Sequence, residues 1–137
     1  VLLDSAALDV PALMQDQPLR LYRNAFGDDP RYWRQVSPVH QLQPRPAPLL
    51  LVHAARRDDA REQNQRMAQA VQQAGGRAVL MPVDLSHGDI NSELGRPGPY
   101  TEAVEAFFAS VGVRGITQHP ASAPPPGRPN GHWQSRL

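Results

Sequence analysis

Hydrophobic and polar positions along residues 48–113 predict strands and helices in alternation. Residues 49–53 are an unbroken apolar run between prolines and charged residues, which is typical of a strand buried on both faces. Residues 60–74 instead have apolar side chains three and four positions apart, which predicts an amphipathic helix with one buried stripe. The members of that stripe are Met67, Ala70, Val71 and Ala74. The Gly75-Gly76 pair predicts the helix end, because glycine readily adopts the left-handed backbone of a C-terminal cap.

The following residues repeat this order. Residues 77–83 predict a second strand, residues 84–89 a turn-rich loop, and residues 100–111 a second amphipathic helix. The apolar positions of that helix are Val104, Phe107, Phe108 and Val111. Strand, helix, strand, loop and helix in this order indicate an α/β fold with a parallel sheet.

The first 47 residues have a less regular pattern. Val1–Leu3 predict the end of a strand, and three short helices are expected at residues 11–14, 19–26 and 29–36. Asp28 or Asp29 would cap the last of these helices, with Pro30 in its first turn. Residues 41–48 are a proline-rich connection into the first buried strand.

Composition and charge exclude several classes of protein. The 137 residues contain no cysteine, which excludes disulfide bonds and thiolate chemistry. No apolar run approaches the roughly 20 residues that cross a bilayer, so we expect a soluble protein without a membrane partner. The cytoplasm is the favoured location, and the sequence leaves the compartment open. The formal net charge is +1, and no aromatic-basic pattern favours nucleic-acid binding. We expect no cofactor, and the sequence leaves the oligomeric state open.

Charge is unevenly distributed and divides the chain at residue 113. Residues 1–113 hold eleven arginines and thirteen acidic residues, whereas residues 114–137 hold three arginines and no acidic residue. This second segment also has five of the fifteen prolines and no apolar periodicity, so we expect a disordered tail. Residues 1–47 would form cap and connecting helices of one domain, and residues 48–113 its α/β core.

Polar residues follow both buried strands, and ligands bind at this end of open parallel sheets. Asp58 and Asp59 come after the first strand, and His87 comes after the second. A carboxylate beside His87 could accept a hydrogen bond from its Nδ1–H and stabilise the imidazolium that forms during catalysis. Two other interpretations stay open. Asp59 and Glu62 have the spacing of a capping box, and His87 has the surroundings of a surface turn residue.

Two further groups in this region carry weaker signals. His53 ends the first apolar run, a position typical of a hydrogen-bonded structural histidine. Asp84, His87 and Asp89 have metal-ligating side chains, but they lack a well-spaced further ligand, so we expect no metal site.

Four segments of the chain occur in an order and spacing that resemble a known family. They are DPRYWRQVSPVHQL (29–42), PLLLVH (48–53), VLMPVDLSHGDINSELG (79–95) and YTEAVEAFF (100–108). Together they resemble the C-terminal half of an α/β-hydrolase, and are most similar to bacterial serine esterases of the carboxylesterase and arylformamidase-like group. Residues 33–38 resemble the segment before the acid-bearing strand, and residues 86–88 resemble the catalytic-histidine loop. The resemblance covers about residues 1–112 and implies a partial α/β-hydrolase fold, namely the C-terminal strands of a parallel sheet with flanking helices.

This resemblance implies a serine hydrolase that cleaves small carboxylic esters or formyl amides. His87 would be the general base that takes the serine proton. Asp59 would be the acid that orients His87, with Asp58 as the alternative. The sequence departs from the family here, since Ala54 and Arg57 stand where many members have a glycine and the acid.

The resemblance also implies that residues 11–36 form a cap over the substrate pocket. Tyr22, Phe26 and Trp33 would line an apolar acyl site for a small-molecule substrate, together with Tyr32. Packing among the short helices is the other interpretation of these aromatic side chains.

The attacking serine of such enzymes stands in a G-x-S-x-G turn, and this pentapeptide does not occur in the sequence. We therefore expect a fragment that carries the acid and the histidine of a catalytic triad without the nucleophile. Alone, it would be inactive and poorly soluble, because its sheet would be incomplete. The alternative is a non-catalytic α/β binding module in which Arg56 and Arg57 attract a carboxylate-bearing ligand.

Overall fold

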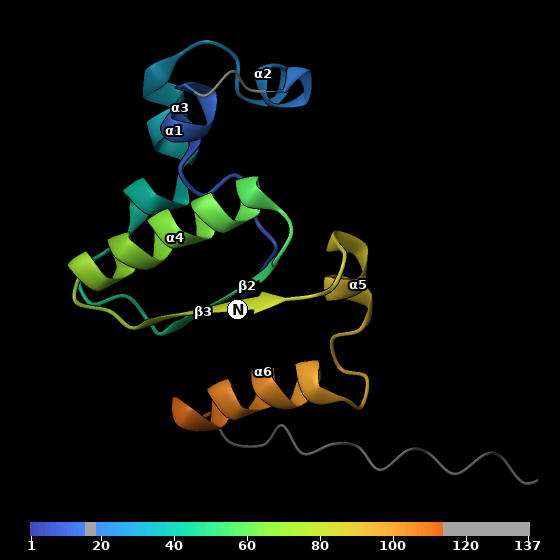
Figure 1. Ribbon diagram of the computed structural model, residues 1–137. Coiled ribbons are helices and arrows are strands. Elements are labelled where there is room, and N and C mark those ends of the chain that lie inside the picture. Colours follow the sequence, from blue (N-terminus) through green and yellow to red (C-terminus); the bar gives the residue numbers. More distant parts are fainter. Residues whose placement is uncertain (16–18, 114–137) are drawn as a thin grey trace, which may run out of the picture.

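The computed structural model describes residues 1–15 and 19–113, and in this part of the chain a parallel sheet lies between two layers of helices (Figure 1). The strands are β1 (Leu2–Leu3), β2 (Leu49–Ala54) and β3 (Ala78–Val83), in the order β1-β2-β3. The α/β class predicted from the alternating pattern is therefore confirmed. The predicted tail at residues 114–137 lies outside the described residues.

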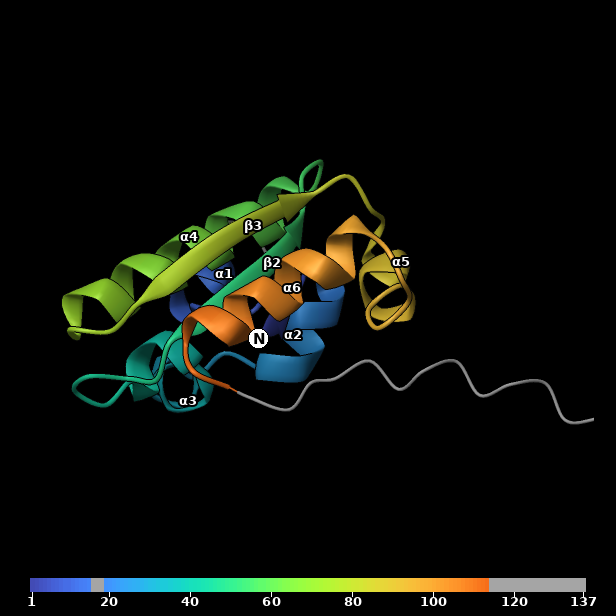
Figure 2. The ribbon, with the colours of Figure 1, turned by 90° about the horizontal axis from the view of Figure 1, so that it is seen from below.

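Strand β2 is the centre of the sheet and is buried on both faces, as its apolar run predicts. Leu51 pairs with Leu2 of β1 and with Leu80 of β3. Helices α4 (Asp58–Gln73) and α6 (Pro99–Ser110) lie on opposite sides of the strands, and Figure 2 shows α6 in front of them and α4 behind.

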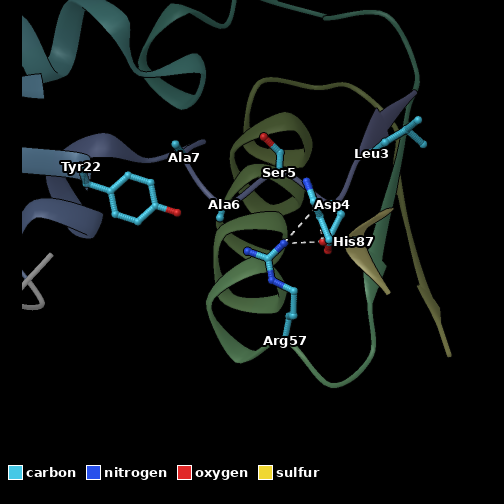
Figure 3. A pocket seen from close by; sticks show the side chains of 8 residues that line it. All are labelled: Leu3, Asp4, Ser5, Ala6, Ala7, Tyr22, Arg57 and His87. Atoms are coloured by element: carbon cyan, nitrogen blue, oxygen red, sulfur yellow. Dashed lines mark hydrogen bonds and ion pairs between the residues drawn. The ribbon is translucent and has the colours of Figure 1, made fainter. Parts of the chain in front are cut away.

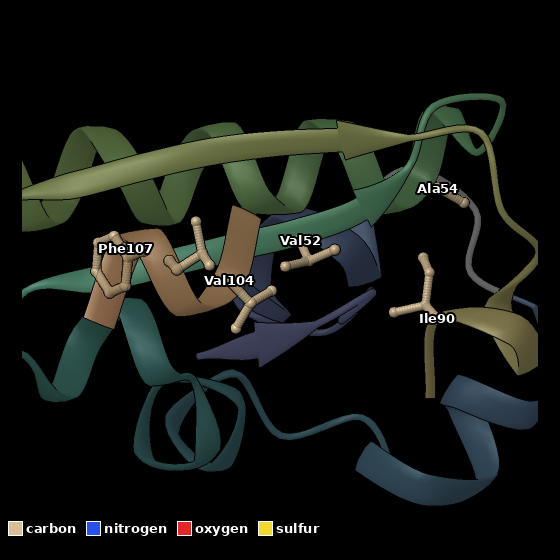
Figure 4. Packing of buried hydrophobic residues seen from close by; sticks show 6 residues of the cluster. Val52, Ala54, Ile90, Val104 and Phe107 are labelled. Atoms are coloured by element: carbon tan, nitrogen blue, oxygen red, sulfur yellow. The ribbon is translucent and has the colours of Figure 1, made fainter. Parts of the chain in front are cut away.

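Side chains of β2 alternate between the two helical layers, because successive residues of a strand point to opposite faces. Leu51 packs in one hydrophobic cluster with Met67 and Val71 of α4. The other cluster contains residues of β2, α5 (His87–Ser92) and α6, and Figure 4 shows its packing. Its buried members are Leu50, Val52, Ala54, Ile90, Val104 and Phe107.

Both ends of α4 can be compared with the prediction. At its C-terminus Gly75 has a φ of 82°, and the Gly76 N–H donates to the carbonyl of Val71 at 2.8 Å. The predicted glycine stop is thus confirmed. At its N-terminus the helix begins at Asp58, and Arg57 occupies the N-cap position without a side-chain capping hydrogen bond. The capping box considered for Asp59 does not form.

Helix α1 (Val10–Gln15) packs on α3 (Pro30–Val36), and the 3₁₀ helix η1 (Pro38–Gln41) packs on α3 and on α4. The carboxylate of Asp29 caps α3 by accepting from the N–H of Arg31 at 2.9 Å, and Pro30 is the first residue of that helix. Ser37 is fully buried, and its hydroxyl accepts from Val10 N–H and donates to the Leu8 carbonyl, both at 3.1 Å. The elements of this region are α1 (Val10–Gln15), α2 (Arg20–Phe26), α3 (Pro30–Val36) and the 3₁₀ helix η1 (Pro38–Gln41).

The loop predicted at residues 84–89 is wrong in its second half, because a short helix, α5 (His87–Ser92), begins there. The hydroxyl of Ser86 accepts from the N–H of Asp89 at 3.2 Å, which caps the first turn. Ile90 of α5 is fully buried in the sheet–α6 cluster, and this contact fixes the helix on the body. Across residues 1–15 and 19–113, every helix is too short or too polar to span a bilayer.

Candidate functional site

Three polar side chains from three separate segments meet at the carboxyl edge of the sheet. Asp4 follows β1, Arg57 follows β2, and His87 is the first residue of α5 after β3. Parallel strands end at the same edge, so these residues converge although up to 83 positions separate them. Figure 3 shows the group and the cavity beside it.

Asp4 is the buried carboxylate of this group. Its side chain is 0% exposed, and Oδ1 accepts a hydrogen bond from the Ala54 N–H at 2.8 Å. Its own N–H donates to the carbonyl of Val52 at 2.7 Å, which extends the pairing of β1 with β2. The φ of Asp4 is 47°, a left-handed conformation that few residues other than glycine adopt, and aspartate is among those that do. This turn leaves the second carboxylate oxygen facing His87.

His87 Nδ1 lies 2.8 Å from Asp4 Oδ2. A carboxylate only accepts hydrogen bonds, so Nδ1 carries the proton and the neutral ring has its lone pair on Nε2. The His87 side chain is 62% exposed, whereas its partner carboxylate is buried. Asp4 therefore orients the imidazole through Nδ1, from the buried side of the ring.

Arg57 connects this pair to a second carboxylate. Its Nη1 makes an ion pair with Asp4 and lies 3.2 Å from His87 Nδ1, and its Nη2 donates to Asp59 Oδ2 at 2.9 Å. Since the Nδ1 proton points at Asp4, the approach of Arg57 to the ring is a contact between two donors. The hydrogen bond with Asp59 is the largest effect that raises the pKa of Arg57, followed by the interaction with Asp4 and opposed by partial burial.

Opposing effects act on the pKa of Asp4. Burial by itself raises the pKa, but hydrogen bonds from the Ala54 N–H, His87 and Arg57 favour the ionised form, and their sum lowers the pKa below its usual value of 3.8. Asp4 is consequently a carboxylate at neutral pH, as a partner of an imidazolium must be.

The two aspartates predicted from the sequence do not contact His87 in the structure. Asp59 binds Arg57, and Asp58 pairs with Arg61 at 2.8 Å on the surface of α4. The carboxylate that does contact His87 comes from the end of β1, one strand farther from β3. Sequence reasoning missed Asp4, although it is the first polar residue after the apolar run at residues 1–3, the same signal that was used for the other two strands.

Two cavities meet at Arg57 and His87. The first, of about 550 Å³, is bordered by the ends of β1 and α2, and in Figure 3 the Tyr22 ring points toward Arg57 across it. The second, of about 520 Å³, lies toward β3 and α5. Asp4, Ser5 and Tyr22 line the first cavity, and Arg56, Asp84 and Ser86 line the second.

The three predicted pocket residues have different positions. Tyr22 lines the first cavity with His87, and Phe26 stacks on Tyr22 with ring centroids 6.3 Å apart. The indole N–H of Trp33 donates to the carbonyls of Phe26 and Gly27, at 3.2 and 3.1 Å, so this residue joins α3 to the end of α2. Of the three predicted pocket residues, Tyr22 therefore shares a cavity with His87, and Phe26 stacks on the Tyr22 ring.

The arginines expected to attract an anionic ligand are already paired. Arg56 forms an exposed ion pair with Asp84 at 3.1 Å, and Arg57 binds both Asp4 and Asp59. No group of three or more metal-ligating side chains occurs within the described part of the chain.

His53 lies at the end of β2 and is 3% exposed. Burial is the main cause that lowers its pKa, so the ring is neutral in the folded protein. Its Nδ1 has no hydrogen-bond partner among the residues that the structure describes. The predicted structural histidine is therefore buried, with this nitrogen unpaired.

The chain matches no protein-family model, and no curated protein or solved structure shows significant similarity to it. By its fold and its site, the chain is an α/β protein with a carboxylate–imidazole pair at the carboxyl edge of a parallel sheet.

Proposed function

We propose that this chain supplies the acid–base pair of a serine hydrolase with an α/β-hydrolase fold, acting on small carboxylic esters or formyl amides. The observation that carries the proposal is the 2.8 Å contact between His87 Nδ1 and the buried carboxylate of Asp4. This is the arrangement in which an acid fixes the tautomer of a histidine base and leaves Nε2 for catalysis. In this proposal Asp4 takes the role that the family resemblance gives to Asp59 or Asp58.

The chemistry follows from that arrangement. Nε2 of His87 removes the proton of a serine hydroxyl as its oxygen attacks the carbonyl carbon of the substrate. Asp4 stabilises the imidazolium, which then returns the proton to the leaving alcohol or amine. The cavity of about 550 Å³ beside His87, with Tyr22 on its wall, is large enough for a small acyl group.

The proposal requires a nucleophile that these 137 residues do not supply in a G-x-S-x-G turn. In the part of the chain that the structure describes, Ser86 and Ser5 lie near His87. The hydroxyl of Ser86 donates to Asp89 at 2.6 Å and caps α5, whereas Ser5 lines the same cavity as His87. We propose a serine from outside these residues, and a Ser5→Ala variant tests the alternative that Ser5 attacks.

The test measures hydrolysis of p-nitrophenyl acetate and butyrate by the product of the complete coding sequence. We expect His87→Ala and Asp4→Asn each to lower kcat by about 10³-fold or more, since both act in the same proton transfer. Asp59→Asn should lower it by less than about tenfold, because its carboxylate contacts Arg57 and not the imidazole.

Circular dichroism of each variant controls for folding. A collapse of activity in Asp59→Asn with an active Asp4→Asn would return the acid role to Asp59. Loss in Ser5→Ala would move the nucleophile into this chain. An inert complete protein, or a fully active His87→Ala, would refute the hydrolase and leave the non-catalytic binding module as the better explanation.

A further inference from the structure

We propose that Asp59 is a positioning residue that acts on His87 through Arg57, by keeping a net negative charge next to the imidazole. This inference deepens the proposed function and rests on it for its catalytic consequence. It gives a role to an aspartate that lies near the histidine without contacting it.

Charged side chains form one chain of contacts that ends at His87. Asp4 contacts His87, Arg57 contacts Asp4, and Asp59 contacts Arg57. Two carboxylates and one guanidinium give a net charge of −1 beside the ring. Without Asp59, the guanidinium would neutralise Asp4, and the imidazolium would face a group with no net charge.

The two Arg57 nitrogens make separate contacts, one toward the imidazole and one toward Asp59. Arg57 Nη1 lies toward Asp4 and His87, whereas Nη2 points the other way to Asp59 at 2.9 Å. Asp59 thus holds the guanidinium from the far side and fixes its distance from the imidazole. The side chains of Arg57 and Asp59 are 32% and 48% exposed, so their charges are only partly screened by water.

The size of the effect follows from Coulomb's law. Taken end to end, the contacts through Arg57 place Asp59 Oδ2 within about 8 Å of His87 Nδ1. For a site exposed to water, one charge at this distance changes the midpoint of a titration by about 0.3–0.7 pH unit.

Other charged and titratable groups also lie near His87, on both sides of the ring. On the side of the second cavity, Arg56 and Asp84 form an ion pair. Asp89, in the same helix as His87, accepts a hydrogen bond from Ser86. On the side of the first cavity, the titratable group that α2 contributes is Tyr22. These groups are unchanged in Asp59→Asn and Arg57→Gln, so a difference between these variants reports the charges of Asp59 and Arg57.

The experiment follows the His87 ring signals by ¹H–¹³C NMR as a function of pH in the complete protein, with His87→Ala identifying the signal. Asp59→Asn should lower the midpoint by about 0.3–0.7 pH unit, because the imidazolium loses a favourable charge. Arg57→Gln should raise it, because a positive charge near the ring is removed. Opposite signs from two partners of one ion pair are not expected from a merely structural role.

Two variants serve as controls. Asp58→Asn removes the same charge one residue earlier, where the carboxylate pairs with Arg61 and not with Arg57, and should shift the midpoint less. Asp59→Glu keeps the charge and should restore the original midpoint. Sodium chloride at about 0.5 M should shrink the Asp59→Asn shift, since it screens charges at this distance.

Equal shifts in Asp58→Asn and Asp59→Asn, or shifts of one sign in Asp59→Asn and Arg57→Gln, would overturn the inference. The acid limb of the kcat/KM profile should move with the NMR midpoint in each variant. If the NMR midpoints move as expected in a protein that hydrolyses no ester, the coupling holds and only the proposed reaction fails.

Discussion

At the scale of single residues, the hydrogen-bond partners of a buried group decide what burial does to its charge. Asp4 and His53 are both almost fully buried near the ends of neighbouring strands. Three donors surround the Asp4 carboxylate and keep it ionised, whereas one nitrogen of His53 has no partner in the described residues. Both pKa values are lowered, which means a charged aspartate and a neutral histidine.

Neutral His53 predicts a pH dependence of stability. Its pKa is lower in the folded protein than its usual 6.5, so the unfolded chain binds the proton more readily. This contribution is complete above about pH 6.5 and decreases by up to about 1.4 kcal/mol per pH unit below it. Urea unfolding should show a lower free energy of unfolding at pH 5.5 than at pH 7.5, and His53→Gln should remove most of that difference. The exposed His40→Gln is the control, and an unchanged pH dependence in His53→Gln would contradict the explanation.

At the scale of elements, short capping signals determine where helices begin and end. Gly75 and Gly76 end α4, and Ser86 begins α5 through its hydrogen bond to the Asp89 N–H. The sequence revealed the first signal because two glycines follow a long periodic stripe. The second lies in a six-residue helix, where the apolar pattern is too short to predict a helix on its own.

The end of α4 predicts a destabilising substitution. A Cβ on Gly76 would lie 2.7 Å from Cγ of Pro46, so Gly76→Ala forces apart the helix end and the connection into β2. We expect a loss of about 1–3 kcal/mol in urea unfolding, the usual cost of overpacking. Gly88→Ala is the control, since its Cβ would meet Ser86 Oγ at 3.9 Å in ordinary contact. A loss in Gly88→Ala as large as in Gly76→Ala would refute the steric explanation.

At the scale of the whole molecule, two hydrophobic layers on either side of β2 hold the sheet edge in place. Leu51 belongs to the α4 layer and Phe107 to the α6 layer. Because the site residues follow β1 and β2 and start α5, both layers fix the position of His87 relative to Asp4. By contrast, α2 contains no buried residue, although Tyr22 on it borders the cavity.

Truncations in the two layers should therefore be costly. Leu51→Ala and Phe107→Ala should each reduce the free energy of unfolding by about 2–5 kcal/mol, because each leaves a cavity in a packed layer. Leu21→Ala on α2 is the control, since this side chain is 70% exposed and its loss should cost less than about 0.5 kcal/mol. If chemical denaturation shows equal losses at Leu51 and Leu21, the two-layer description of the core is wrong.

The sequence by itself determined the α/β class, the buried strand predicted at residues 49–53 and observed as Leu49–Ala54, the C-terminal end of α4 and the position of His87 after β3. These features follow from periodicity and from glycine and proline positions, which act over a few residues. The partner of His87 was decided by tertiary structure, because strand order sets which carboxylate reaches the ring. With β2 between β1 and β3, the chain turns Asp4 inward at the end of β1, while the first turn of α4 directs Asp59 to Arg57. In the sequence, a spacing of 28 residues favoured Asp59 as the partner of His87. In the structure the partner is Asp4, 83 residues away, because burial and backbone pairing at the end of β1 hold its carboxylate against the ring.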